Sequence, residues 1–163
     1  DAAQPDGMAR SRRGETKAED GALRAERELA SLLAAGERVP EGLIREEDFT
    51  DPACAFVARL ALSGGRSRIQ EALEQVEDEA LRGDITRLLT TGERVDPERR
   101  PQMIADCTDR LRLRRLEKEI DDCQARAARP GLTLQEQVEL ATRLNQLYDQ
   151  VERLRRGAKG GEP

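Results

Sequence analysis

The chain has 163 residues, of which 37% are hydrophobic and 37% are charged, and its formal net charge is −5. An acidic chain of this composition is a poor candidate for direct nucleic-acid binding, which depends on clustered Lys and Arg. It has no His, and its three cysteines lie outside any C-x-x-C pair, so we expect no metal, no cofactor and no catalysis by this segment.

Helix-forming residues dominate the composition. Aromatic residues make up only 2% of the chain, and Leu, Ala, Arg and Glu recur throughout. Because these four residue types favour helices, the sequence predicts an all-α protein. The sequence has no apolar run of membrane-spanning length and no signal peptide. We therefore expect a cytoplasmic protein with reduced cysteines and no membrane contact, and a monomer when isolated.

The N-terminal part of the chain predicts one helix after an irregular leader. Residues 1–19 lack periodicity and are rich in Gly, Pro and charge, which is typical of the disordered end of a linker. A helix should begin near Asp20 and stop at Gly36, because glycine favours the left-handed conformation that ends helices. A short helix around Leu43 and Ile44 should follow.

Three further helices are predicted before residue 97. Asp51 is a candidate N-cap followed by Pro52 at the first helical position. Ser67 and Gln70 have the spacing of a capping box, and so predict the start of the next helix. A third apolar pattern ends at Gly92, which we expect to terminate its helix.

A long helix is predicted from about residue 97, with its start between 97 and 101, to about residue 128. Its apolar stripe rotates to nearly the opposite side around residue 112, at about 100° per residue. Cys107 and Leu111 lie on the first stripe, whereas Leu116 and Ile120 lie on the second. One helix should therefore serve two cores, a helical bundle over residues 20–111 and a hairpin subdomain over residues 112–156.

The last helix is predicted to pair with the second half of the long helix. A break at Pro130 and Gly131 is followed by a capping box, Thr133 with Glu136, and residues 157–163 read as a disordered tail. Apolar residues recur at spacings of three and four in both segments, which predicts an antiparallel helical hairpin. The predicted seam residues are Leu113, Leu116, Ile120, Cys123, Leu140, Leu144, Leu147, Val151 and Leu154.

Three features occur in a fixed order: RAERELASLL at residues 24–33, REEDFTDP at residues 45–52, and the terminal charged hairpin. Together they resemble the C-terminal helicase-binding domain of bacterial DNA primase, over roughly residues 20–156. The resemblance implies a bundle followed by a protruding hairpin. It also implies that the hairpin docks on the N-terminal region of the hexameric replicative DNA helicase. Such a module couples primer synthesis to unwinding at the replication fork, and its parent primase is a DNA-directed RNA polymerase.

Five hairpin residues are candidates for contact with a partner. Leu132 and Leu134 flank the turn, and Tyr148 lies beside the seam. Arg153 and Arg155 could steer an acidic partner or complement the C-terminus of their helix. Two other functions remain open at this point. The chain could be the N-terminal domain of the helicase itself, or a coiled-coil adaptor or scaffold.

Overall fold

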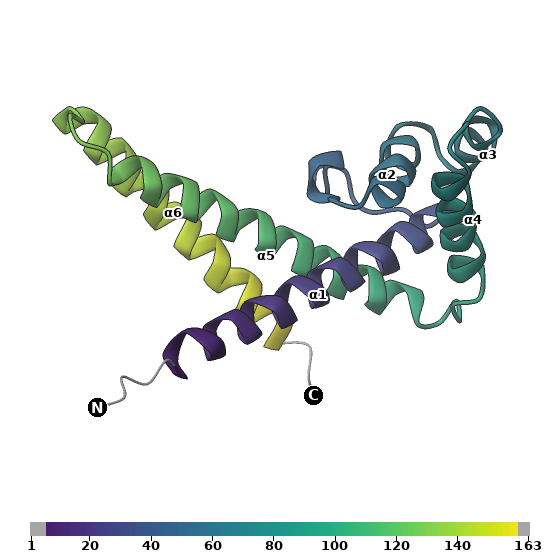
Figure 1. The fold of residues 1–163 in the computed structure, drawn as a ribbon, viewed down its shortest axis with the longest axis horizontal. Helices are drawn as coiled ribbons and strands as arrows, with labels where there is room; N and C mark the ends of the chain where they lie inside the picture. Colours follow the sequence, from purple (N-terminus) through teal and green to yellow (C-terminus); the bar gives the residue numbers. More distant parts are fainter. Residues whose placement is uncertain (1–5, 160–163) are drawn as a thin grey trace. The chain divides into compact units, whose positions relative to one another are not determined.

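The computed structural model describes residues 6–159, with side chains described for residues 20–157. Within this part of the chain the fold is all-helical, with six α-helices, one short 3-10 helix and no strand (Figure 1). The all-α prediction is therefore confirmed. The elements are α1 (Asp6–Ala34), η1 (Glu46–Asp48), α2 (Pro52–Gly64), α3 (Arg66–Glu74), α4 (Glu79–Glu93), α5 (Arg100–Ala127) and α6 (Leu134–Lys159).

The chain forms two compact units that divide between Thr108 and Asp109, inside α5. The sequence placed this division three residues later, between residues 111 and 112. The first unit holds α1 to α4 and the start of α5, and the second holds the remainder of α5 with α6. Both units consist of helices that cover one another's apolar faces.

Helix α1 is longer than the sequence predicted. It begins at Asp6 rather than near Asp20, so the prediction of an irregular segment was wrong for residues 6–19, and residues 1–5 lie outside the described part. Most of these residues are Ala, Arg, Glu, Lys or Met, which are good helix formers, and the sequence has no proline between Pro5 and Pro40. The stop was predicted correctly. Gly36 has a φ of 102°, and the Glu37 N–H donates to the Leu32 carbonyl across the helix end.

Helices α1 and α4 pack at very close range in the first unit. The point of closest approach is Gly92, where an added Cβ would lie 1.9 Å from the Ser31 carbonyl oxygen and 3.2 Å from the Ala35 Cβ. The prediction that Gly92 ends its helix was therefore wrong, because α4 continues through it to Glu93. The missing side chain serves the contact between helices, rather than a left-handed turn.

The N-terminus of α2 is held by two carboxylates. Asp51 is its N-cap, as predicted, and accepts a hydrogen bond from the Cys54 N–H at 3.2 Å. The fully buried Glu26 of α1 accepts the Thr50 hydroxyl at 3.0 Å and the Asp51 N–H at 2.5 Å. The segments RAERELASLL and REEDFTDP are therefore in direct contact, and Glu26 links them.

Two local predictions in the first unit were wrong. Leu43 and Ile44 lie in and just after a turn, and the short helix of this region is η1, a few residues later. Ser67 does not cap α3, which begins at Arg66 directly after Gly65. Gly65 has a φ of 82°, so the chain turns from α2 into α3 in a single residue, which leaves no room for a separate cap.

Helix α5 carries the rotation of its apolar face that the sequence predicted. It begins at Arg100, inside the predicted range, and Cys107 and Leu111 are buried on its first stripe. The Cys107 thiol donates to a Glu28 carboxylate oxygen of α1 at 3.5 Å, within the first unit. Leu116 and Ile120, on the second stripe, belong to a separate cluster in the second unit.

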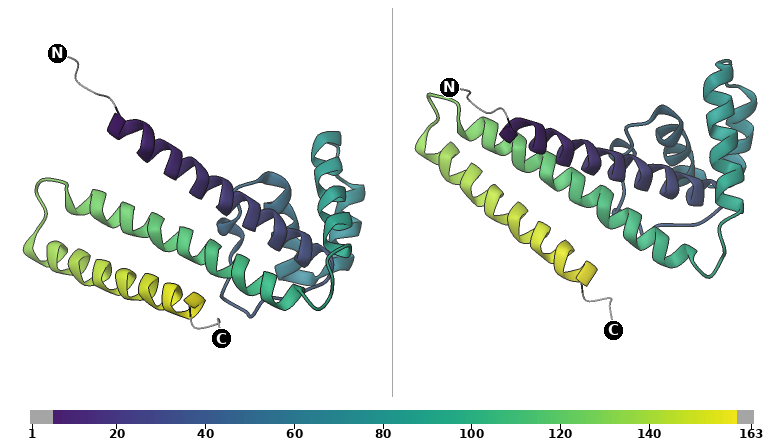
Figure 2. Two further views of the ribbon diagram at one scale, coloured as in Figure 1. Left: turned by 90° about the horizontal axis from the view of Figure 1, so that it is seen from below. Right: turned by 60° about the horizontal axis from the view of Figure 1, so that its bottom comes forward.

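In the second unit, α5 and α6 run side by side in opposite directions (Figures 1 and 2). Gly131 turns with a φ of 85°, and the predicted capping box is present. The Glu136 N–H donates to the Thr133 hydroxyl at 3.1 Å, and the Thr133 N–H donates to the Glu136 carboxylate at 2.8 Å. The tail predicted from residue 157 was wrong at its start, because α6 continues to Lys159 and only residues 160–163 lie outside the described part.

Candidate interaction surface

The predicted seam residues form the core of the second unit. Its members are Leu116, Ile120, Cys123, Leu147 and Val151, with Leu113, Leu144 and Leu154 packed against them. Leu140 is also buried, at the turn end of the seam. Leu147 is the centre of the cluster, with an exposed fraction of 0%. The seam is a single row of contacts, so one side of α6 is covered and the rest faces outward.

The outward side of α6 carries an apolar face of its own. Four large hydrophobic side chains are strongly exposed among residues 20–157, and three of them are on α6: Leu134 at 76%, Val138 at 57% and Tyr148 at 46%. They lie within an arc of about 80° on a helix that turns about 100° per residue. We call Leu134, Val138 and Tyr148 the α6 apolar face.

Val138 was missed by the sequence reasoning, which concentrated on the seam and the turn. The signal was present: residues 134, 138, 141, 145 and 148 recur at spacings of four and three, as the seam residues do. Ala141 and Asn145 are exposed between the larger side chains and carry no charge. The α6 apolar face is therefore uncharged along about 21 Å, at about 1.5 Å per residue.

The five candidate contact residues do not form one surface. Leu134 and Tyr148 belong to the α6 apolar face, and Tyr148 Oη accepts a hydrogen bond from Gln124 Nε2 at 2.7 Å. Leu132 is half-buried in the turn and lines a pocket with Cys123 and Leu140. The prediction of two exposed leucines at the turn was therefore wrong for Leu132, because the turn folds this side chain back over the end of the seam.

The two candidate arginines near the end of α6 differ in position. Arg155 lies on the Tyr148 side and pairs with Glu117 of α5 at 3.8 Å. Arg153 is exposed and points about 100° away from the α6 apolar face. Only Arg155 is placed to border the apolar face.

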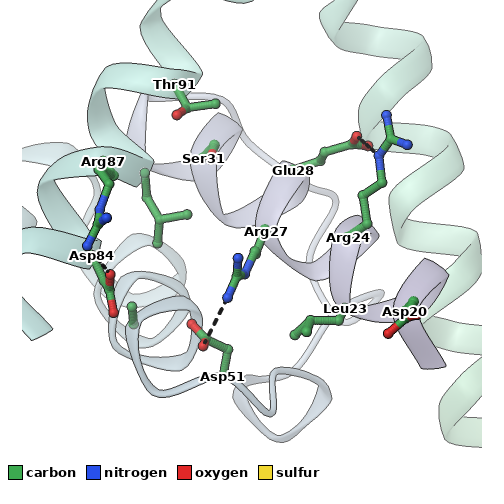
Figure 3. A pocket seen from close by; sticks show the side chains of 12 residues that line it. Asp20, Leu23, Arg24, Arg27, Glu28, Ser31, Asp51, Asp84, Arg87 and Thr91 are labelled. Atoms are coloured by element: carbon green, nitrogen blue, oxygen red, sulfur yellow. Dashed lines mark hydrogen bonds and ion pairs between the residues drawn. The ribbon is translucent and has the colours of Figure 1, made fainter. Parts of the chain in front are cut away.

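The first unit contains a charged cleft of about 480 Å³ between α1, α4 and the start of α2 (Figure 3). The residues that line it include Leu88 and three arginines. Each arginine has a carboxylate beside it. The pairs are Arg24 with Glu28 at 3.0 Å, Arg27 with Asp51 at 4.0 Å and Arg87 with Asp84 at 2.6 Å. The charges are largely balanced within the walls, so the cleft has no strong preference for an ion of either sign.

The cysteines are free and buried. Burial raises the pKa of the Cys54 thiol well above its ordinary value, and the hydrogen bond and negative charge of Asp51 raise it further. The thiol therefore stays protonated, which makes it a poor nucleophile.

The part of the chain that the structure describes contains no group of three or more side chains suited to hold a metal ion. None of its helices combines the length and apolar character needed to cross a membrane. The α6 apolar face, with three strongly exposed hydrophobic side chains, is the candidate interaction surface of the described residues. Comparisons with protein-family models, with curated proteins and with solved structures found no match for this chain.

Proposed function

We propose that this chain is a protein interaction module, and that its second unit docks on the N-terminal region of a ring-shaped replicative DNA helicase. The observation that carries the proposal is the α6 apolar face, with Leu134 and Val138 more than half exposed. The resemblance of the sequence to the helicase-binding domain of bacterial primase supplies the partner. In this role the module couples RNA primer synthesis to unwinding.

The chemistry of the face supports a protein partner. Exposed apolar residues that cluster on one side of an element mark contact sites more often than isolated ones do. The residues between Leu134 and Tyr148 on this side are uncharged, whereas Asp149, Glu152 and Arg155 follow at one end. An apolar centre beside a charged border is the usual pattern of a protein interface.

The α6 apolar face suits a groove in a folded partner. A helix that presents residues at spacings of three and four can place them in an apolar groove of another protein. The face covers only two heptads, and Glu152 occupies the next position of the pattern. Isolated helices of this length form marginal pairs, so a second copy of the same face is a weak partner. A preformed groove avoids this limit because it is already ordered.

The test is a calorimetric titration of the helicase with the full chain and with the double variant Leu134→Ala, Val138→Ala. Interface hot spots cost about 2 kcal/mol or more on truncation, so the variant should bind about thirtyfold more weakly. The matched control is Leu62→Ala, which removes the exposed leucine of α2 in the first unit and should leave the affinity unchanged.

Circular dichroism must show equal helicity in the three proteins, so that the change in affinity reports contact rather than folding. The proposal is wrong if the original chain does not bind the helicase. The role of the α6 apolar face is wrong if the double variant binds as tightly as the original chain.

A further inference from the structure

A pocket of about 380 Å³ lies at the turn end of the second unit, between the last turns of α5 and the first turns of α6. Its volume falls within the range of about 300–1,000 Å³ that is typical of ligand sites. The pocket has an apolar base and a basic rim. Cys123, Leu132 and Leu140 form the base, and Arg126, Arg129 and Arg143 stand at the rim.

The pocket exists because the seam ends early. The sequence pattern continues from Cys123 to residue 127, but that residue is alanine and it is exposed. Its methyl group cannot fill the space beyond Cys123 and Leu140. Leu132, which follows the turn at Gly131, also lines this space. The result is a hollow whose base continues the apolar seam.

The charges around the pocket leave two arginines available. Glu136 also lines the pocket, but its carboxylate accepts the Thr133 N–H of the capping box at 2.8 Å. Glu139 accepts a hydrogen bond from Gln135 at 3.1 Å, and Arg143 pairs with Glu119 at 2.6 Å. Within residues 20–157, the guanidinium groups of Arg126 and Arg129 have no ion pair or hydrogen bond of their own. These two groups can therefore take a carboxylate without losing an existing partner.

The pocket opens on the side of α6 that faces away from the α6 apolar face. Counted at about 100° per residue from Leu134, its α6 residues Glu136, Leu140 and Arg143 lie between about 180° and 240°. One flat contact cannot cover both sides of a helix. The pocket must therefore take a separate segment of a partner.

We infer that this pocket binds an aliphatic side chain of the partner that is flanked in sequence by Asp or Glu. The apolar base holds the aliphatic group, and the paired N–H groups of Arg126 and Arg129 donate to the carboxylates in a bidentate geometry. A nucleic acid is the poorer fit. A phosphate brings no apolar group to Cys123, Leu132 and Leu140.

The inference rests on the proposed function, because the helicase supplies the segment in the test.

The first variant is Arg126→Glu, Arg129→Glu in the full chain, titrated with the helicase ring. It should bind about tenfold more weakly or worse, because like charges now face each other across the contact. Its matched control is Arg94→Glu, Arg99→Glu, which makes the same change of charge at exposed positions of the first unit and should bind within about twofold of the original chain.

A second variant tests the apolar base. Leu132→Ala should weaken binding by about fivefold to tenfold if an aliphatic side chain enters the pocket. Bound helicase should also slow alkylation of Cys123, measured by mass spectrometry, because the occupant covers the base. Equal rates with and without helicase would contradict the inference.

The outcomes separate the two proposals. If the α6 double variant binds weakly while the Arg126 and Arg129 variant binds normally, the pocket inference is wrong and the proposed function stands. If the original chain does not bind the helicase, both are overturned. If the Arg126 and Arg129 variant instead loses binding to a single-stranded DNA oligonucleotide and keeps its affinity for helicase, the pocket is a nucleic-acid site and the inference is overturned.

Discussion

The two units of this chain bury their apolar residues in different ways. In the first unit, α1 packs against both α2 and α4, and residues such as Leu29, Leu32 and Ile85 are fully buried. In the second unit, α5 and α6 share one seam, where Leu116, Ile120 and Cys123 each retain an exposed fraction of 8%. A helix covered on several sides has no free apolar face, whereas a helix covered on one side can offer another to a partner.

This difference has an energetic consequence. Close packing in several directions makes the first unit sensitive to an atom added between its helices, because those helices cannot move apart independently. The second unit depends on a short row of buried side chains, each contributing about 1.5–3 kcal/mol against the conformational entropy of two ordered helices. We therefore expect α6 to open more readily than α1 and α4.

The largest expected effect is that of Gly92→Ala in the first unit. The new methyl group would collide with the Ser31 carbonyl oxygen, a backbone atom that cannot move without displacing α1. We expect the free energy of unfolding to fall by about 3 kcal/mol or more, measured by urea denaturation followed by circular dichroism.

Gly83→Ala on the same helix is the matched control. A Cβ at Gly83 meets only the end of the Arg87 side chain, at 3.8 Å. Alanine should therefore stabilise α4 by about 0.5–1 kcal/mol through its better helix propensity. Equal effects of the two substitutions would show that α1 and α4 do not pack as closely as described.

The next effect is that of Leu147→Ala in the second unit. Truncation of this fully buried residue should cost about 3 kcal/mol. Hydrogen exchange of α6 should speed up markedly, while amides of α1 and α4 keep their protection.

Leu134→Ala makes the same chemical change at an exposed position of the same helix, and should alter stability by less than about 0.5 kcal/mol. If Leu147→Ala lowers protection equally in both units, then the two units unfold as one and the contrast between them is mistaken.

The smallest effect tests the link between α1 and the start of α2. Glu26→Ala removes the acceptor for both the Thr50 hydroxyl and the Asp51 N–H, and should destabilise the first unit by about 2 kcal/mol. Glu26→Gln should cost less, because its amide oxygen can accept the Asp51 N–H while the Thr50 hydroxyl turns to accept from its NH₂ group. Thermal unfolding would measure both. A larger loss for Gln than for Ala would contradict this account of Glu26.

Features that depend on a few adjacent residues were predicted well. The Asp51 N-cap, the stop at Gly36 and the capping box of Thr133 and Glu136 are all present. Each is a local hydrogen-bonding arrangement, so the residues that form it stand within a few positions of one another. The seam residues could also be predicted, because the helical period places residues three and four positions apart on one side of a helix.

Predictions failed where a residue has two possible uses. Gly92 has the spacing of a helix stop, but it is a point of close approach to a helix some 60 residues earlier in the chain. Leu132 and Leu134 looked equivalent beside the turn, yet one closes a pocket and the other is exposed. In each case the outcome depends on which segment lies opposite, and a local pattern does not contain that information.

By itself, the sequence determined the all-α class, the helix caps, the rotation of the apolar face within α5 and the residues of the seam. These follow from backbone preferences and from a fixed helical period. Only the tertiary structure decided that Glu26 holds the start of α2, that α1 and α4 meet at Gly92, and that a pocket opens beyond Cys123 and Leu140. These features depend on atoms brought together from distant parts of the chain, and their close fit is settled only when the helices pack.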